Sequence, residues 1–423
     1  MRRGIAATAL VASLALAATA CGSGDDGASS DGPLTITWWD TSNATNEAPT
    51  YKALVKQFEK ANPKIKVKYV NVPFDQAQNK FDTAAGSKGA PDVLRAEVGW
   101  TPAFAKKSYL APLDGTPALA DQSKFQPNLL KQARYEGKTY GVPLVTDTLA
   151  LVYNKALFKK AGIDQPPTTW PDLKKAAAAV KKKTGADGYW GSTQGYYSQP
   201  FLYGEGADTV DAAAKKITVR SPAAKKAFTT WQGLFDGPGL HKADSTADAY
   251  AHIQDAFTSG KTAAIIQGPW EITNFYQGAA FKDKANLGIA PVPAGSAGKQ
   301  GAPTGGHNLS VYAGSDQAHQ DAAVKFVQFM TSAKSQEQIA LKNATLPTRQ
   351  DAYTARVQAD PGIAGYQKVL GVAQPRPELP EYSSLWGPLD SELPKIAGGK
   401  ESLDEGLGNA ESAMAKLVPD FKK

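Results

Sequence analysis

The chain has 423 residues, which exceeds the size of one ordinary hydrophobic core and is sufficient for two α/β domains. Its formal net charge is +7, and positive and negative residues are interspersed along its length rather than gathered in blocks. No Lys/Arg-rich cluster with interleaved aromatic residues occurs, so the charge indicates a solvated surface and not a surface for nucleic acid.

The first 20 residues have the composition of a secretion signal. Arg2 and Arg3 form a positively charged start, and a short run rich in Ala and Leu follows. Ala18-Thr-Ala-Cys21 then places small residues before the only cysteine of the chain, a pattern that resembles a bacterial lipobox with Ala18 at the position where leucine is usual. We therefore predict a signal peptide over residues 1–20 and lipid attachment at Cys21, which would anchor the protein at the extracellular face of the cell membrane.

Residues 21–32 follow the predicted cleavage site and consist almost entirely of Gly, Ser and Asp. This composition is typical of flexible linkers, so we predict a flexible tether between the lipid and the folded body. No later apolar run reaches the length that spans a bilayer. The body is therefore predicted to be exported and free of disulfides.

The folded body begins with a regular alternation of strands and helices. Strands are predicted at 34–39, 65–69 and 92–94, because apolar residues there alternate or form a short buried run. Helices are predicted around 51–58, where Tyr, Leu, Val and Phe recur on one face, and around 75–85. Strands separated by helices pair in parallel, so this part predicts an α/β sheet with helical crossovers.

The stretch Tyr140–Lys155 is an apolar run interrupted by the polar trio Thr146-Asp147-Thr148. One interpretation is a strand that comes to the surface for three residues, since charges are rarely fully buried. The other is a strand that crosses between two domains and presents the Asp147 carboxylate to a ligand.

The second half of the chain repeats the same kinds of signal. Predicted helices begin after Thr169 and Ser221, each with proline at the first helical position. Residues 263–266 predict a buried strand and Leu287–Val292 a second crossing strand. Residues 309–312 and the amphipathic helix 322–330 are expected to return to the first sheet, and the remainder from about 335 is expected to be helical with breaks.

Metal and nucleophile motifs are missing from the sequence. The four histidines, at 241, 252, 307 and 319, have no metal-ligand spacing, and no cysteine remains in the body to assist them. No Gly-x-Ser-x-Gly motif occurs, and Gly260-Lys-Thr262 lacks the upstream glycine and the following helix of a phosphate loop. We therefore predict neither a metal site nor a cofactor.

Aromatic residues with polar neighbours recur at the ends of the predicted strands. In open α/β sheets ligands bind at the carboxyl ends of strands, and aromatic faces beside carboxylates and amides are suited to carbohydrate. The candidate ligand-binding residues on this basis are Asp40, Glu97, Trp100, Asp147, Gln194, Tyr196, Trp270, Glu271 and Trp386.

Several segments in this order resemble the extracellular solute-binding proteins of carbohydrate ABC importers, and among them the maltose/maltodextrin-binding proteins in lipoprotein form. The markers are Phe58-Glu-Lys-Ala-Asn-Pro63, Pro91-Asp-Val93, Tyr135–Pro143, Leu151–Lys155, Ala256–Ala263, Gly268-Pro-Trp270 and Leu346-Pro-Thr348. The resemblance implies a two-lobe periplasmic-binding-protein fold of type II, with crossing hinge strands and a ligand cleft between the lobes. It also implies a monomeric, non-catalytic receptor that delivers an oligosaccharide to membrane permease subunits.

On this fold we expect an N-terminal lobe of residues 33–146 and 293–332, and a C-terminal lobe of residues 147–292 and 333–423. The resemblance gives Asp147 as a carboxylate for sugar hydroxyls, and it gives stacking rings at Tyr196, Trp270 and Trp386. It places Asp40 in the cleft, and His307-Asn308 in a loop that faces it. The sequence departs from the family pattern at two places. Near Gly99-Trp100 an Asp-Arg pair is absent, and Glu97 and Trp100 are the candidates to replace it. At Gln194 a glutamate is usual.

Two alternatives remain at this level. A receptor of the same fold for another sugar or small solute would share every marker above. A secreted glycosidase would need two carboxylates at a defined separation, for which Asp147, Glu97, Asp40 and Glu271 are the candidates.

Overall fold

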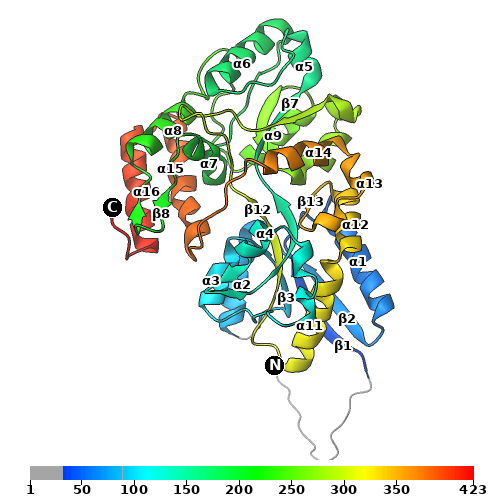
Figure 1. Cartoon of the computed structure of the whole chain (residues 1–423). Helices are drawn as coiled ribbons and strands as arrows, with labels where there is room; N and C mark the ends of the chain where they lie inside the picture. Colours follow the sequence, from blue (N-terminus) through cyan, green and yellow to red (C-terminus); the bar gives the residue numbers. More distant parts are fainter. Residues whose placement is uncertain (1–31, 88) are drawn as a thin grey trace, which may run out of the picture.

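The computed structural model describes residues 32–87 and 89–423. The predicted signal peptide, Cys21 and all of the predicted tether except Gly32 lie outside the described residues. Figure 1 shows two bodies of strands and helices, one built on a six-stranded sheet and one on a three-stranded sheet. We call them the large-sheet lobe and the small-sheet lobe. Within the described ranges, no helix has both the length and the apolar character needed to cross a membrane.

The large sheet has the strand order β13-β6-β12-β3-β1-β2. β1 pairs in parallel with β2 and with β3, as the alternation of strands and helices predicts. β12 lies antiparallel between β3 and β6, so a late part of the chain fills the middle of the sheet. The strands are β1 (Leu34–Asp40), β2 (Ile65–Asn71), β3 (Val93–Glu97), β6 (Val142–Asp147), β12 (Gly305–Val311) and β13 (Leu346–Pro347).

Helices cover this sheet because each presents one apolar face. In α1 (Ala48–Ala61) the side chains of Tyr51, Leu54 and Phe58 are buried, at the helical spacing seen in the sequence. The rings of Phe58 and Trp38 each lie 5.1 Å from that of Phe326, which joins α1, β1 and α11 in one core. The other helices of this lobe are α2 (Phe74–Gly86), α3 (Trp100–Lys106), α4 (Pro127–Gln132), α11 (Gln317–Met330) and α12 (Ala333–Asn343).

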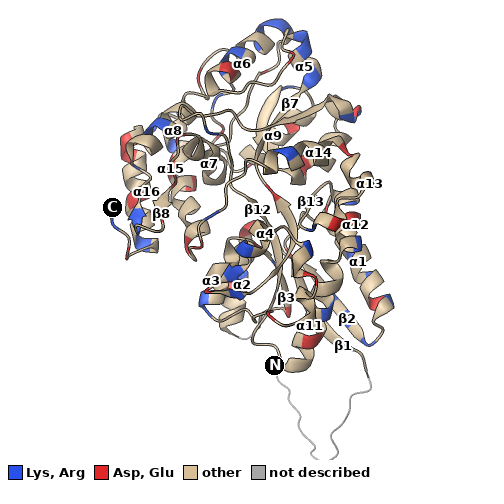
Figure 2. Cartoon of the chain, in the orientation of Figure 1, with Lys and Arg blue, Asp and Glu red and all other residues tan. Residues whose placement is uncertain are grey.

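The small sheet has the order β10-β7-β11, and both outer strands run antiparallel to β7. Its strands are β7 (Ala150–Asn154), β10 (Ala264–Gln267) and β11 (Leu287–Ala290). Its helices include α5 (Lys155–Lys160), α6 (Trp170–Thr184), α7 (Gly195–Gly204), α8 (Pro222–Gln232), α9 (Ala249–Thr258), α10 (Ile272–Gln277), α14 (Pro361–Leu370), α15 (Trp386–Ala397) and α16 (Leu403–Leu417). Positive and negative residues lie on the helices of both lobes (Figure 2), in keeping with the interspersed charges of the sequence.

The stretch Tyr140–Lys155 contains two strands that belong to different sheets. β6 ends at Asp147 in the large sheet, and β7 begins at Ala150 in the small one, so Thr148 and Leu149 connect the lobes. The chain therefore crosses between the lobes at the polar trio, as predicted, although residues 140–155 do not form one continuous strand. Both connecting residues are fully buried.

The return path differs from its prediction. Leu287–Val292 was expected to be a crossing strand, but β11 ends at Ala290 inside the small sheet, and residues 291–304 carry the chain back to β12. This return lies against another connection, because Gln374 accepts a backbone hydrogen bond from Thr304 and donates one to the carbonyl of Ala302, both at 2.8 Å. The apolar run at 287–292 would have the same sequence pattern in a strand within one sheet and in a strand that crosses between lobes.

The expected lobe boundary at residue 332 also differs from the structure. It assigns all of residues 333–423 to the C-terminal lobe, whereas the first part of this range belongs to the large-sheet lobe. Helix α12 packs on α1, and β13 pairs with β6 at the edge of the large sheet. The buried amide of Gln336 fixes this segment: its Nε2 donates to the Pro143 carbonyl at 3.1 Å, and its Oε1 accepts from the Thr348 amide at 2.8 Å. A strand of two residues has no periodicity from which it could be predicted.

We expect Gln336→Ala to destabilise the protein by about 3 kcal/mol, because backbone groups that it satisfies would be left buried without partners. Gln338→Ala is the matched control, since Gln338 accepts its hydrogen bond from Gln57 at the exposed surface. Urea unfolding of the two variants measures the difference. Equal stability of the two variants would contradict this role for Gln336.

Candidate binding site

The carboxyl ends of β3 and β6 meet the start of β12 at the side of the large sheet that faces the small-sheet lobe. The register places Glu97 opposite His307 and Asp147 opposite Gly305. Asp147 approaches Gly305 so closely that a side chain at this glycine would collide with its carboxylate. Two predicted carboxylates and one predicted histidine thus share one edge, as the strand-end rule anticipates.

Arg376 is the group that joins this edge to the small-sheet lobe. It lies in the loop between α14 and α15, and its Nη1 donates to Glu97 Oε1 at 2.6 Å. Both side chains are less than 10% exposed, so each charge depends on the other for compensation. The guanidinium also lies over the Trp386 ring at 4.8 Å and the Tyr196 ring at 5.6 Å. Sequence reasoning missed Arg376, whose only local sign is its position between two prolines.

Two further contacts tie the same loop to the large-sheet lobe. Lys106 Nζ donates to Glu381 Oε1 at 2.8 Å, and the amide of Glu136 donates to Glu378 Oε1 at 3.1 Å. Ser383 lies against Gly99, where any side chain would collide with its hydroxyl oxygen. The loop 371–385 therefore spans the gap between the lobes beside the candidate site.

The electrostatic state of the site follows from burial and from this arginine. Burial raises the pKa of Asp147 from its usual 3.8 to about 7, against the opposing attraction of Arg376. Burial and the nearby arginines Arg95 and Arg376 hold the pKa of His307 well below its usual range, so its imidazole is neutral. Glu97 is engaged by Arg376, whereas the carboxylate of Asp147 accepts no hydrogen bond from any group in the described part of the chain. Asp147 is therefore the carboxylate with acceptor capacity to spare.

Several polar atoms of this site have no hydrogen-bond partner. Among the described residues, Arg376 Nε, Ser383 Oγ, Trp386 Nε1 and both ring nitrogens of His307 are shielded from solvent and have no hydrogen-bond partner. Buried polar groups are normally satisfied, so such a concentration indicates a place where another molecule supplies the missing donors and acceptors.

Tyr196 and Trp386 form the aromatic wall of the site. Their rings meet at 5.1 Å with an interplanar angle of 61°. Tyr196 lies in the first turn of α7, which is held on α15 because the Gly195 amide donates to Asp390 Oδ1 at 2.6 Å. Both predicted stacking residues are only partly buried.

Trp270 and Glu271 belong to one network centred on Tyr250. The Tyr250 hydroxyl accepts from Trp270 Nε1 at 2.9 Å and donates to Glu271 Oε1 at 2.7 Å. Glu271 Oε2 accepts from Asn274 at 2.6 Å, so both of its oxygens are occupied and the side chain is buried. Glu271 thus orients Trp270 through Tyr250, a residue that the sequence did not single out.

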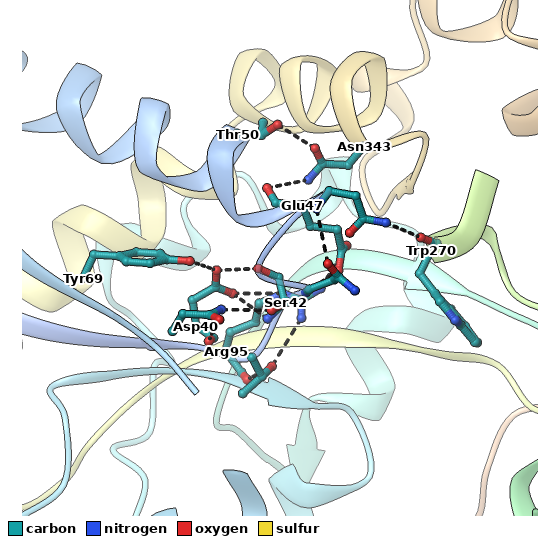
Figure 3. Close-up of polar contacts among 12 residues, drawn as sticks. Asp40, Ser42, Glu47, Thr50, Tyr69, Arg95, Trp270 and Asn343 are labelled. Carbon is teal, nitrogen blue, oxygen red and sulfur yellow. Dashed lines mark hydrogen bonds and ion pairs between the residues drawn. The ribbon is translucent and has the colours of Figure 1, made fainter. Parts of the chain in front are cut away.

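Asp40, the last residue of β1, belongs to a second ion cluster (Figure 3). Its carboxylate accepts from the Ser42 amide at 3.0 Å and from the Tyr69 hydroxyl at 2.6 Å, and Arg95 Nε is 3.8 Å away. Asp40 has no exposed surface, although it was expected in the cleft. Arg95 also lies 3.8 Å from Glu47, so the cluster fixes the loop between β1 and α1.

That loop contacts the small-sheet lobe through Asn46. Asn46 Nδ2 donates to the backbone carbonyl of Trp270 at 3.4 Å (Figure 3). The buried cluster of Asp40, Arg95 and Glu47 therefore supports a contact with an expected stacking residue, although none of the three faces the aromatic wall.

The remaining expected residues occupy different positions. Gln194 is exposed at the start of α7, next to Tyr196 but without a side-chain hydrogen bond in the described chain. Asn308 is fully buried, and its side chain donates a hydrogen bond to Thr101 Oγ1 in α3. It therefore does not take part in the site with His307. Trp100 is 4% exposed and lies under the ring of Phe74. In the described ranges, no group of His, Cys, Asp and Glu is arranged to hold a metal ion.

In structure the chain is similar to the GacH receptor of Streptomyces glaucescens, which has been solved without ligand and with acarbose. The two are 46% identical with a TM-score of 0.86, and the match covers 92% of this chain and 100% of that one. A maltotriose binding protein of Thermus thermophilus, bound with maltotriose, is 25% identical with a TM-score of 0.77, over 91% and 99% of the two chains.

In sequence the chain is 29% identical to the maltodextrin-binding protein MdxE of Bacillus subtilis, over 96% of this chain and 95% of the relative. It is 28% identical to the diacetylchitobiose binding protein DasA of Streptomyces coelicolor, over 96% of each. The sequence profile described as bacterial extracellular solute-binding protein matches residues 42–337, well over half of the chain. The family resemblance is thereby confirmed: the chain belongs to the bacterial extracellular solute-binding proteins, which are binding proteins and not enzymes.

Proposed function

We propose that this protein captures an oligosaccharide of the maltodextrin or acarbose class between its lobes and delivers it to the membrane subunits of an ABC importer. The observation that carries the proposal is that the Arg376 guanidinium lies over the aromatic rings of Tyr196 and Trp386 and, together with the Asp147 carboxylate, lies next to Gly305. Sugar rings offer apolar C–H faces to aromatic side chains and hydroxyl groups to charged ones.

Hydroxyl groups also match the unsatisfied atoms of the site. Each hydroxyl is both a donor and an acceptor, so an oligosaccharide is able to donate to Asp147 and to accept from Arg376 Nε or Trp386 Nε1. A polyanion would pair poorly here, because Arg376 is already engaged by Glu97 at 2.6 Å. The mixture of acceptors and donors favours a neutral, hydroxyl-rich ligand.

The choice among sugars rests on the relatives. The receptor that is 46% identical has been solved with acarbose, and MdxE is a maltodextrin-binding protein. DasA, at 28% identity, is a diacetylchitobiose binding protein, which supports a receptor for another oligosaccharide as the second candidate.

The carboxylates of the site also support binding rather than hydrolysis. Of the four candidates for a glycosidase pair, Asp40 and Glu271 are buried with their oxygens occupied. Glu97 is held by Arg376, which leaves Asp147 without a second free carboxylate for acid–base work. This agrees with membership of a family of binding proteins.

The free energy of ligand binding would be coupled to closure of the lobes. Contacts between the lobes, such as Arg376–Glu97 and Lys106–Glu381, form only when the lobes are together. A ligand that touches both lobes binds the closed arrangement better and shifts the population towards it. The permease would then recognise the closed receptor, a monomer held near it by a lipid at Cys21.

Isothermal titration calorimetry of the purified protein with maltose, maltotriose, maltotetraose, acarbose and diacetylchitobiose tests the proposal. We expect binding of the α-glucans or acarbose. Heat only with diacetylchitobiose would favour the second candidate, and no heat with any α-glucoside would refute the maltodextrin or acarbose class.

Trp386→Ala should weaken α-glucan binding by about 1–3 kcal/mol, because one aromatic sugar contact and its buried area are lost. This corresponds to roughly a 5- to 150-fold higher Kd. Trp386→Phe keeps a ring and should recover part of the affinity. Leu417→Ala, which shortens an exposed side chain on α16, is the control that should leave binding unchanged. Unaltered affinity in Trp386→Ala would show that the ring does not contact the sugar.

Asp147 should make both stability and binding depend on pH. In the unfolded chain its carboxyl ionises near its usual pKa of 3.8, whereas burial raises its folded pKa to about 7. The folded state therefore retains the proton longer, and stability relative to an uncharged residue falls as pH rises from about 4 to about 7.

The expected result for Asp147→Asn is a gain in Tm over the natural protein that grows between pH 4 and pH 8. The same substitution should weaken sugar binding at pH 8, because an amide has one acceptor oxygen instead of two. Thermal melts and calorimetry at both pH values measure these changes. A variant that does not fold would show instead that Asp147 is a structural residue of the hinge.

A further inference from the structure

Phe74, the first residue of α2, is a large apolar side chain left open to solvent. It is 50% exposed, and among the described residues only one other large hydrophobic side chain, Leu417 on α16, is comparably exposed. Exposure of a phenylalanine costs hydrophobic free energy that burial would recover. A single exposed ring is common on protein surfaces, so its surroundings decide whether it has a role.

Those surroundings are aromatic and rigid. The Phe74 ring stacks on Trp100, with centroids 5.2 Å apart and an interplanar angle of 25°. Trp100 is itself 4% exposed and packs against Phe104 at 6.5 Å, so Phe74 rests on a fixed base. A ring held in this way loses little conformational freedom when another flat surface is placed on its outer face.

Phe74 is also connected to the candidate sugar site. Its ring meets the edge of the His307 imidazole at 5.9 Å and 73°, and His307 stands opposite Glu97 in the pairing of β12 with β3. Glu97 binds Arg376, which lies over Trp386. We call the series Trp386, Arg376, Glu97, His307 and Phe74 the row. Its neighbours are joined by side-chain contacts, except that Glu97 and His307 are strand partners, and Phe74 is its exposed end.

His307 provides polar chemistry at this end. Neither of its ring nitrogens has a hydrogen-bond partner in the described chain, and both are shielded from solvent. Because its pKa lies well below the usual range, the imidazole is neutral and has one donor and one acceptor nitrogen. A sugar hydroxyl, which donates and accepts, is the complement of such a ring.

We propose that Phe74, stacked on Trp100 and in contact with His307, forms an additional sugar subsite at the exposed end of the row, which binds a further pyranose unit of a long oligosaccharide. This inference rests on the proposed oligosaccharide function. It makes Phe74 a determinant of chain-length preference: short ligands bind at the aromatic wall of Tyr196 and Trp386, and only longer ligands reach Phe74.

Calorimetry of the full folded protein with maltose, maltotriose, maltotetraose and maltopentaose tests this subsite. The natural protein should bind the longer glucans more tightly than the shorter ones. Phe74→Ala should raise the Kd for the longest glucans roughly 3- to 10-fold, the effect of one aromatic contact, while the Kd for the shortest glucan that binds is unchanged. Phe74→Trp should retain the preference for length.

Two controls separate the subsite from other effects. Leu417→Ala removes an exposed apolar side chain on α16, far along the chain, and should alter no affinity. The Tm of Phe74→Ala should stay close to that of the natural protein, because half of the ring is already in solvent.

The outcomes are distinguishable. Equal affinity of the natural protein for all lengths, or a loss in Phe74→Ala that is the same for every length, would overturn the subsite while leaving the oligosaccharide function in place. Failure of the natural protein to bind any of these glucans, or acarbose, would instead refute the proposed function on which the subsite rests.

Discussion

The charge balance around one buried guanidinium governs the space between the lobes. Arg376 comes from the small-sheet side of the molecule, yet its direct ionic partner, Glu97, ends a strand of the large sheet. Removal of either charge would leave the other buried and unpaired. The same guanidinium lowers the energy of an ionised Asp147 and packs on the rings of Tyr196 and Trp386. Lobe contact, carboxylate ionisation and the aromatic wall are therefore coupled through a single side chain.

A second arginine, Arg95, compensates buried carboxylates in a similar way. Arg95 compensates Asp40 and Glu47 inside the large-sheet lobe, where neither carboxylate faces the aromatic wall. The cluster fixes the β1–α1 loop, from which Asn46 contacts the carbonyl of Trp270. The carboxylates at the strand ends thus fall into two sets: one is satisfied internally and provides support, and the other retains capacity for a partner. The distinction depends on which arginine is close, and both arginines reach their partners through the fold rather than along the chain.

The fold was predictable where the evidence is local. Alternation and helical spacing in the first hundred residues identify the strands and helices of the parallel part of the large sheet, and the polar trio at Asp147 marks the passage between sheets. Strand β13 was not predictable, because its two residues are fixed by pairing with β6 and by the amide of Gln336. In the site, strand ends brought Glu97, Asp147 and His307 to one edge, but the ion pair of Arg376 joins residues 279 positions apart and leaves no pattern in the sequence. Asp40 shows the converse: a carboxylate at a strand end has the same sequence context whether it faces a cleft or an internal arginine.

The position of β12 has a consequence for how the molecule is made. This strand, residues 305–311, lies between β3 and β6, which precede it by well over a hundred residues. Until it arrives, the facing edges of β3 and β6 have no partner, and unpaired strand edges are templates for aggregation. Pairing at such separations in sequence is slow, because a long loop must close before any contact forms. The large sheet is therefore complete only once the chain up to Val311 is available to fold. A nascent chain that ends before β12 exposes two strand edges in the middle of its future sheet.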